Sequence, residues 1–147
     1  MTEVISHSAE ETEQFAAKLA GVLSGGEVIA YFGDLGMGKT TFTAGLAKGL
    51  GIDAEVSSPT FALVHEYGGQ PPLYHFDMYR ITTYDDLCST GFFDYIDSGA
   101  ILAVEWSENI EAVLPDNTVR IEISRGNADE ERIFRIYGED IYENSWR

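Results

Sequence analysis

Two stretches of the chain are apolar throughout, and the segment before the first of them has the spacing of a surface helix. Residues 28–32 and 101–104 are continuous apolar runs, which are typical of strands buried on both faces of a sheet. In residues 8–23 the apolar positions recur at helical spacing, and Ser8 with Glu11 forms a candidate capping box. We therefore expect a helix, a buried strand directly after it, and a second buried strand much later in the chain.

Other segments alternate between apolar and polar residues, as strands with one buried face do. Residues 61–67 pair in this way with residues 73–77, and residues 119–124 with residues 132–137, across segments rich in turn-forming residues. We expect two antiparallel hairpins at the edges of a partly parallel sheet. Between the hairpins, residues 82–87 predict a short helix, and residues 91–96 predict another short piece that is either helical or irregular.

The first buried strand leads directly into a glycine-rich segment. Residues 33–40 read GDLGMGKT and match G-x-x-x-x-G-K-[ST] at every defined position, and residues 40–50 predict a helix. Glycines let backbone N–H groups surround an anion, and the start of a helix adds a partial positive charge. An ordinary glycine-rich turn is the alternative, but the strand before it and the helix after it favour a phosphate-binding loop. The sequence therefore predicts nucleotide binding.

The strand, the loop and the helix also predict a fold. They indicate an α/β protein of the P-loop NTPase type: a three-layer sandwich with a mixed sheet, parallel core strands, antiparallel hairpins and helices on both faces. In such a protein Lys39 reaches the terminal phosphates, Thr40 ligates the bridging magnesium ion and Thr41 is a further phosphate contact. We expect one domain over residues 1–147, with residues 139–147 as a polar tail.

Composition restricts the partners and the compartment. The chain has 25 Asp and Glu against 9 Lys and Arg, a net charge of −16, and such a surface repels nucleic-acid backbones and anionic lipid. We expect protein partners, and ATP that depends on magnesium; acidity that serves only solubility is the alternative. The single cysteine, Cys88, excludes an internal disulfide, and we expect it to be buried or half-buried. With no apolar run of membrane-spanning length and no signal-peptide pattern, the protein is expected to be cytoplasmic.

Four residues outside the loop are candidates for the same site. Glu105 follows the second apolar run, where P-loop proteins place a magnesium-binding carboxylate; a solvated strand end is the alternative. Thr60 follows a Ser-Ser-Pro turn and is a candidate switch residue. Asp77 is a candidate either to orient the attacking water or to support the metal shell. Turns commonly contain both residue types, which is the alternative for each. Arg80 is either a charge stabiliser or part of a surface salt bridge.

Two further features narrow the chemistry. The three histidines, His7, His65 and His75, lack metal-ligand spacing, and His75 is interpreted as a sheet residue. No Asn-Lys-x-Asp motif, which reads guanine, occurs in the sequence. We therefore expect no zinc, and adenine as the base.

Five sequence strings together resemble one protein family. They are GDLGMGKTTF at residues 33–42, SPTF at 58–61, YHFDMYR at 74–80, GFFDY at 91–95 and VEW at 104–106. Their order and spacing are similar to those of the bacterial TsaE (YjeE) proteins over most of the chain. The resemblance implies a small ATPase that is required to form threonylcarbamoyladenosine next to the anticodon of tRNA. It also implies that TsaB and TsaD are partners, and that they rather than this chain hold the tRNA.

The resemblance assigns roles to individual residues as well. It implies that Thr40 and Glu105 hold the magnesium ion, that Thr60 lies in a switch-like segment, that Asp77 is required for activity, and that Trp106 follows the metal glutamate. The N-terminal stretch around Ser8 to Thr12, together with Arg132, resembles places that flank the adenine. The candidate nucleotide contacts are Gly33, Gly36, Met37, Gly38, Lys39, Thr40, Thr41, Thr12 and Arg132, and the candidate catalytic residues are Asp77, Thr60 and Lys39.

Two other functions fit a phosphate loop in a chain of this size. One is a small-molecule or nucleoside kinase, which the lack of an arginine-rich lid disfavours. The other is a nucleotide-sensing module without turnover. The two alternatives differ from an ATPase in the fate of the terminal phosphate.

Overall fold

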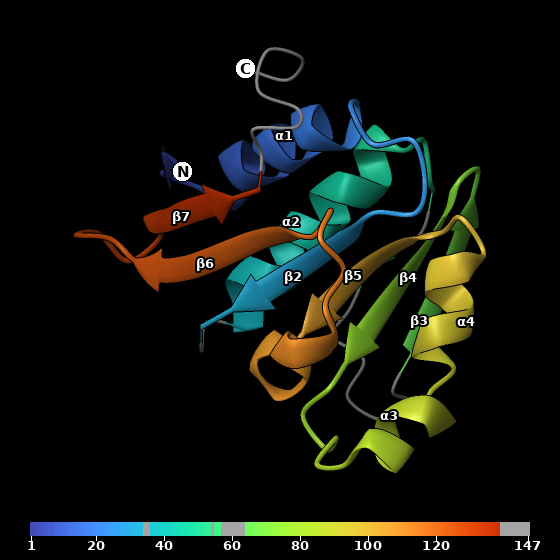
Figure 1. The fold of residues 1–147 in the computed structure, drawn as a ribbon. Coiled ribbons are helices and arrows are strands. Elements are labelled where there is room, and N and C mark those ends of the chain that lie inside the picture. Colours follow the sequence, from blue (N-terminus) through green and yellow to red (C-terminus); the bar gives the residue numbers. More distant parts are fainter. Residues whose placement is uncertain (34–35, 54, 57–63, 139–147) are drawn as a thin grey trace.

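The computed structural model of the protein describes residues 1–33, 36–53, 55–56 and 64–138. The helices are α1 (Ala9–Ala20), α2 (Gly36–Gly49), α3 (Tyr84–Ser89), α4 (Phe92–Asp97) and the 3-10 helix η1 (Ser107–Val113). The strands are β1 (Thr2–Ser6), β2 (Val28–Phe32), β3 (Val64–Gly69), β4 (Pro72–Asp77), β5 (Ile101–Glu105), β6 (Val119–Arg125) and β7 (Arg132–Tyr137). Figure 1 shows the strands in one twisted sheet with helices on either side.

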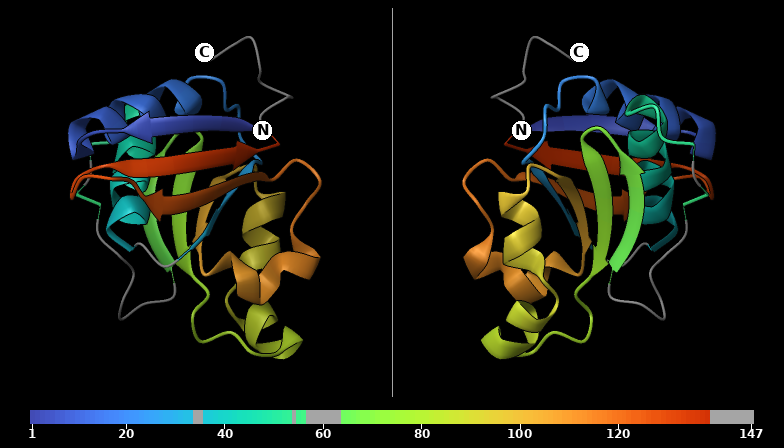
Figure 2. Two further views of the ribbon diagram at one scale, coloured as in Figure 1. Left: turned by 90° about the vertical axis from the view of Figure 1, so that its left-hand side faces the viewer. Right: turned by 90° about the vertical axis from the view of Figure 1, so that its right-hand side faces the viewer.

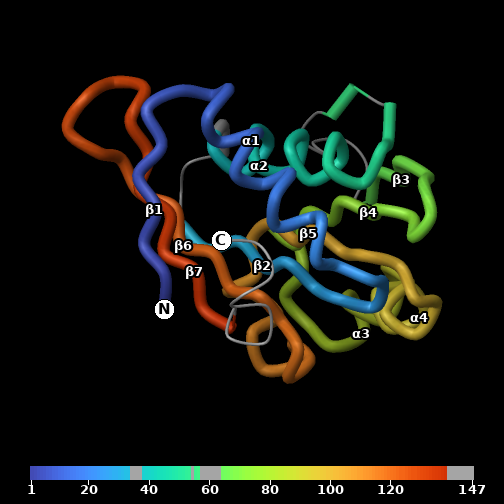
Figure 3. The backbone as a smooth tube through the Cα atoms, turned by 90° about the horizontal axis from the view of Figure 1, so that it is seen from above, coloured from blue at the N-terminus to red at the C-terminus, as the bar shows by residue number. Residues whose placement is uncertain are grey.

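The sheet has seven strands in the order β1-β7-β6-β2-β5-β4-β3. Strand β2 is parallel to both of its neighbours, β5 and β6, and β4 is parallel to β5. The strands β1 and β7 at one edge, and β3 at the other, pair antiparallel. Figure 3, seen from above, follows this order across the molecule. The predicted parallel core with antiparallel hairpins is therefore confirmed.

The core lies in two layers, one on each face of the sheet. In β2, Ile29 and Tyr31 pack in the cluster with α1 and α2, whereas Val28 and Ala30 pack in the opposite cluster with α3, α4 and η1. Successive side chains of a strand point to opposite faces, so a strand covered on both faces must be apolar at every position. Figure 2 shows α1 and α2 on one side of the sheet and α3 and α4 on the other, as predicted.

Helices α1 and α2 approach each other closely through glycines. A Cβ atom added to Gly45 would lie 2.5 Å from the carbonyl oxygen of Glu13, and one added to Gly49 would lie 2.6 Å from that of Ala17. The backbone of α2 therefore rests directly on the backbone of α1. This contact sets the position of the helix that begins at the glycine-rich loop.

We expect Gly45→Ala to destabilise the fold, because the added methyl group would force the two helices apart. Overpacking of this kind costs about 1–3 kcal/mol, which outweighs the gain of about 1 kcal/mol from replacing a helical glycine. Chemical denaturation measures the change. The matched control is Gly21→Ala: Gly21 has right-handed helical dihedrals (φ −63°), and an added Cβ would come no closer than 3.3 Å to other atoms. Equal stability of the two variants would contradict this account of the helix contact.

Several details differ from the sequence predictions. Strand β1 was not predicted, because its five residues carry only a weak alternation. The first helix ends at Ala20 rather than near residue 23. The Ser8 side chain accepts a hydrogen bond from the N–H of Glu11 as expected, but the Glu11 carboxylate accepts from the N–H of His7 and not from that of Ser8.

Cys88 is exposed, so its predicted burial is wrong: it follows the buried Leu87 in a short helix with one covered side.

Several of the sequence predictions concern residues that the structure does not describe. The described ranges leave out the switch candidate Thr60, residues 61–63 of the predicted hairpin strand, residues 34–35 of the predicted loop, and the tail at residues 139–147. Within those ranges, no helix is both long enough and apolar enough to cross a membrane.

Candidate nucleotide and metal site

The glycine-rich loop begins where β2 ends, and Gly33 has a conformation that favours glycine. Its φ is 106°, and an added Cβ would lie 2.7 Å from the carbonyl oxygen of Ile123 in β6. A side chain at this position would therefore be excluded both by the backbone dihedral and by the neighbouring strand. The loop then enters α2, whose first turn contains Gly36, Met37 and Gly38.

The first turn of α2 is tied to β2 by buried hydroxyl groups. The Thr43 hydroxyl donates to the carbonyl oxygen of Lys39 at 2.9 Å and lies 2.8 Å from the hydroxyl of Tyr31. Because the Thr43 proton is used, the Tyr31 hydroxyl is the donor in the second bond. Burial raises the pKa of Tyr31, so this donor keeps its proton. The start of α2 is therefore held in place before any ligand binds.

Lys39 is the most unusual side chain of the site. It is only 2% exposed, and no carboxylate forms an ion pair with it in the described part of the chain. Its Nζ atom lies 5.3 Å from the ring centroid of Trp106. A cation–π contact stabilises an ammonium group by about 2 kcal/mol when desolvated, much less than the cost of burying an unpaired charge. An anionic ligand would supply the missing partner.

Trp106 presents its ring to Lys39 through a rare backbone conformation. Its φ of 58° makes it the one described non-glycine residue with a positive φ. Tryptophan is a bulky residue, for which the left-handed region is a genuine outlier that concentrates at functional sites. The ring also contacts Tyr79, with centroids 5.0 Å apart. The conformation turns the chain sharply between β5 and η1.

Two carboxylates end neighbouring strands at the edge of the sheet where α2 begins. Asp77 of β4 is in register with Glu105 of β5, and β5 lies next to β2. Glu105 is 4% exposed, and its Oε2 atom lies 2.6 Å from Nε2 of His75. Burial raises the pKa of Asp77, and the charge of Glu105 adds to this shift. The N–H of Tyr79, which donates to the Asp77 carboxylate, and the positive charge of Lys39 oppose it. The strand that carries Glu105 therefore lies next to β2, the strand before the loop.

These residues suit a magnesium ion that arrives with phosphates. No group of three or more His, Cys, Asp or Glu side chains that could enclose a metal occurs among the described residues. Magnesium in phosphate sites needs only one or two protein carboxylates, because phosphates and waters fill the other positions. Glu105 and Asp77, with the hydroxyl of the half-buried Thr40, supply oxygen donors of the right kind. The described residues therefore fit an ion that the protein and a bound phosphate coordinate together better than an ion coordinated by protein side chains alone.

A small cavity of about 110 Å³ is lined both by residues of α2 near its start and by Thr12 and Arg132, the residues predicted to flank the adenine. It is lined by Ser8, Ala9, Thr12, Gly38, Thr41, Glu130 and Arg132. The unpredicted strand β1 explains this meeting, because Ser6 is in register with Arg132 and its hydroxyl lies 2.7 Å from that of Thr12. Thr12 and Arg132, 120 positions apart in the numbering, thus line one cavity beside the start of α2.

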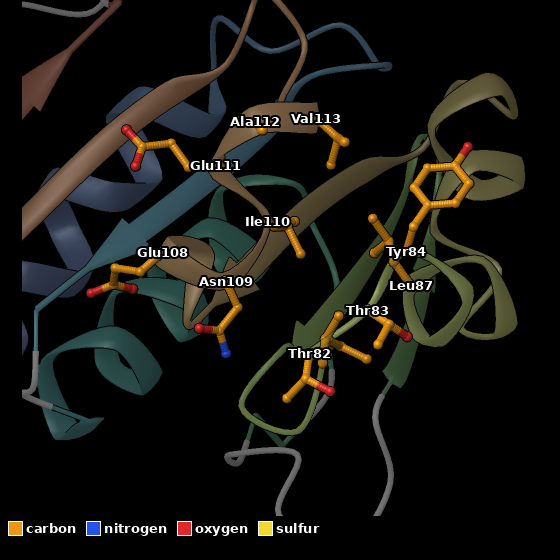
Figure 4. Close-up of a pocket in the computed structure, with 11 residues that line it drawn as sticks. Thr82, Thr83, Tyr84, Leu87, Glu108, Asn109, Ile110, Glu111, Ala112 and Val113 are labelled. Carbon is orange, nitrogen blue, oxygen red and sulfur yellow. The ribbon is translucent and has the colours of Figure 1, made fainter.

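A larger cavity, of about 610 Å³, lies between α3 and η1. Figure 4 shows its lining, with Thr82, Thr83, Tyr84 and Leu87 facing the residues of η1. On the η1 side, Glu108 accepts a hydrogen bond from the N–H of Gly33 at 3.3 Å. This cavity is therefore separate from the glycine loop but is connected to it through η1. Arg80, the remaining candidate, is exposed and forms no ion pair within the described residues.

Sequence reasoning missed the role of one residue, His75. It was interpreted as a sheet residue, and it is one, but its ring also contacts the carboxylate of Glu105. The available signal was strand parity: His75 is two positions before Asp77 and therefore shares its face of the sheet. The arrangement of strand, glycine loop, buried lysine and strand-end carboxylates is that of a P-loop NTPase-like α/β protein.

Comparison with known proteins narrows this class to one family. The family model "Threonylcarbamoyl adenosine biosynthesis protein TsaE" matches residues 6–134. The chain belongs to the TsaE family.

The relatives cover most of the chain. The "tRNA threonylcarbamoyladenosine biosynthesis protein TsaE" of Bacillus subtilis is 43% identical over 125 residues, which cover 84% of this chain and 78% of the relative. The protein of the same name from Aquifex aeolicus is 41% identical over 138 residues, 92% of this chain and 97% of the relative. The crystal structure of YdiB from Bacillus subtilis superposes with a TM-score of 0.78 at 36% identity, covering 97% of this chain and 88% of that one.

Proposed function

We propose that this protein binds ATP together with a magnesium ion and hydrolyses the ATP to ADP and phosphate, in the pathway that forms threonylcarbamoyladenosine in tRNA. The pathway is supported by membership of the TsaE family and by the names of the relatives. The single observation that carries the chemistry is Lys39, a buried ammonium group without a carboxylate partner among the described residues. Its position in the first turn of α2 is the one in which a P-loop lysine meets terminal phosphates.

In this proposal the loop binds the phosphates of the nucleotide, and the small cavity binds its adenosine. The phosphates are bound by backbone N–H groups of Gly33, Gly36, Met37 and Gly38, and the start of α2 adds a favourable dipole. Thr41 is both a phosphate contact and part of the cavity lining. Thr12 and Arg132, on the same lining, contact the adenosine.

Thr40 and Glu105 hold the magnesium ion in this proposal. With Thr40 and Glu105 as its protein ligands, a magnesium ion would supply positive charge to neutralise the phosphates. Asp77 orients the attacking water, since it ends the strand beside Glu105 and stays half-buried. Thr60 completes the site as a switch residue.

TsaB and TsaD are the proposed protein partners. The net charge of −16 supports this assignment, because an acidic chain favours contact with proteins over direct contact with tRNA. We therefore propose that the partners hold the tRNA. Partner binding then controls turnover at a site that this chain supplies.

The test is a measurement of phosphate release from ATP by the protein alone and with the TsaB–TsaD pair of the same organism. We expect slow release by the protein alone and faster release with the pair. Transfer of labelled phosphate to a nucleoside, in place of release, would instead establish a kinase. ATP binding without either outcome would establish a sensing module.

Asp77→Asn tests the catalytic part of the proposal. The amide keeps the shape of the side chain and its acceptor for the N–H of Tyr79, but it removes the charge that orients the water. We expect turnover to fall by about 100-fold or more, with ATP affinity within about threefold of that of the parent protein. Asp97→Asn, at an exposed residue of α4, is the matched control. Unchanged turnover in Asp77→Asn would remove Asp77 from the mechanism.

A further inference from the structure

Hydrogen-bonded side chains on β3 and β4 form a chain that ends at the carboxylate of β5. The Nδ1 atom of His65 lies 3.1 Å from the hydroxyl of Tyr67, and this hydroxyl lies 3.5 Å from Nδ1 of His75. The other nitrogen of His75, Nε2, lies 2.6 Å from Oε2 of Glu105. The carboxylate is therefore the end point of a network that spans three adjacent strands.

The direction of the last bond follows from the chemistry of its two groups. An ionised carboxylate only accepts hydrogen bonds, so Nε2 of His75 carries the proton and donates it to Glu105. The side chains of His75 and Glu105 are 0% and 5% exposed, so water does not compete for this bond. The hydroxyl of Tyr67 lies at the opposite nitrogen, Nδ1, to which it can donate when Nε2 carries the proton. Outer partners of this kind commonly orient metal ligands in proteins.

We propose that His75 is a positioning residue for Glu105. By holding Oε2, it fixes the carboxylate and leaves Oε1, which accepts no hydrogen bond from the described residues, to take a divalent cation that arrives with the nucleotide. Tyr67 and His65 extend the support to the edge of the sheet. This inference rests on the proposed function, because it assigns Glu105 to the ion.

The competing explanation is that the pair of His75 and Glu105 only stabilises the fold. The two explanations differ in what a substitution changes. A purely structural pair affects the midpoint of unfolding and nothing specific to metal. A positioning residue affects the affinity for the metal, even when the folded protein binds the metal-free nucleotide normally.

Two amide substitutions separate these explanations, because they differ mainly in reach. In His75→Gln the amide nitrogen stands near the position of Nε2 and can still donate to Glu105. In His75→Asn it stands near the position of Nδ1 and falls short of the carboxylate. Both variants place a neutral amide in the same buried site, so losses of packing and of ring contacts are similar.

The probe is Mn²⁺, whose binding in the presence of a non-hydrolysable ATP analogue is measured by electron paramagnetic resonance. We expect His75→Asn to bind Mn²⁺ about 10–100-fold more weakly than the parent protein, and His75→Gln to recover most of this affinity. Affinity for the analogue in the presence of EDTA should be the same in all three proteins. Tyr67→Phe, which removes the outer hydroxyl and keeps the ring, should cause a smaller loss of Mn²⁺ affinity.

Equal Mn²⁺ affinity in the Asn and Gln variants would overturn the positioning role while leaving the proposed function in place. Should His75→Asn fail to fold, Tyr67→Phe decides the question in the same assay, and an unchanged affinity would overturn the role. Failure of the parent protein to bind the analogue, or to bind Mn²⁺ with it, would instead refute the proposed function, and the positioning role with it.

Discussion

Lys39→Met is expected to abolish tight nucleotide binding while leaving the free protein at least as stable as the parent. Lys39 is buried, and its ammonium group makes a cation–π contact with the ring of Trp106. No carboxylate among the described residues forms an ion pair with it. Removal of one member of a buried, hydrogen-bonded charge pair costs about 2–5 kcal/mol, so ATP affinity should fall by about 30-fold to several thousand-fold. Calorimetric titration with ATP measures the loss.

The stability of the same variant tests the physical explanation. Replacement of buried charges by apolar groups of similar volume is often neutral, or stabilises by about 1–4 kcal/mol. The midpoint of denaturation of the ligand-free protein should therefore stay the same or rise. Lys48→Met is the control: Lys48 is exposed and paired with Glu13 at 2.8 Å, so its loss should affect neither ATP affinity nor, appreciably, stability. Normal ATP affinity in Lys39→Met would contradict the assignment of the phosphate site.

Glu105→Gln is expected to uncouple nucleotide binding from magnesium. In the parent protein, magnesium should strengthen ATP binding because Glu105 adds a negative ligand beside Thr40. The amide keeps an oxygen that accepts from Nε2 of His75, so the side chain stays in place and the fold is preserved. We expect the affinity for magnesium in the complex to fall by about 100-fold, with little change in metal-free ATP affinity.

The measurement is ATP affinity across a magnesium titration, with turnover recorded in parallel. Glu111→Gln is the matched control, because Glu111 is an exposed glutamate of η1 that pairs with Arg120 at the surface. A Glu105→Gln protein with the magnesium dependence of the parent would show that another group holds the ion. A parent protein with no magnesium dependence would refute the metal site altogether.

Much of the fold was predictable because its signals are local. A strand buried on both faces must be apolar throughout, and the loop motif follows one such strand directly, so the sequence alone placed β2 and most of α2. The helix begins at Gly36 rather than at the predicted residue 40, so its first turn falls within the segment predicted as the loop. The hairpins β3–β4 and β6–β7 were predicted from alternation and turn residues. Strand β1 was not predicted because it is short and because its partner, β7, lies at the far end of the chain.

The candidate site was predictable only in part. Lys39, Thr40 and Glu105 could be named because each follows from a motif or from the end of an apolar run. The burial of Lys39 against Trp106, with no carboxylate ion pair among the described residues, could not be predicted from the sequence. It depends on the left-handed turn at residue 106 and on the packing of η1. The exposure of Cys88 could not be predicted either, because it depends on which side of α3 faces the sheet.

The sequence by itself determined the glycine-loop motif, the two apolar strands and the family resemblance, since each is carried by short contiguous segments. The tertiary structure decided which distant residues meet. The register of β4 against β5 places Asp77 opposite Glu105 and brings the ring of His75 to the carboxylate of Glu105. The register of β1 against β7 places Arg132 beside Ser6, and therefore near Thr12. Register is set by the joint burial of whole strands, and a shift of one residue would turn each of these side chains to the other face.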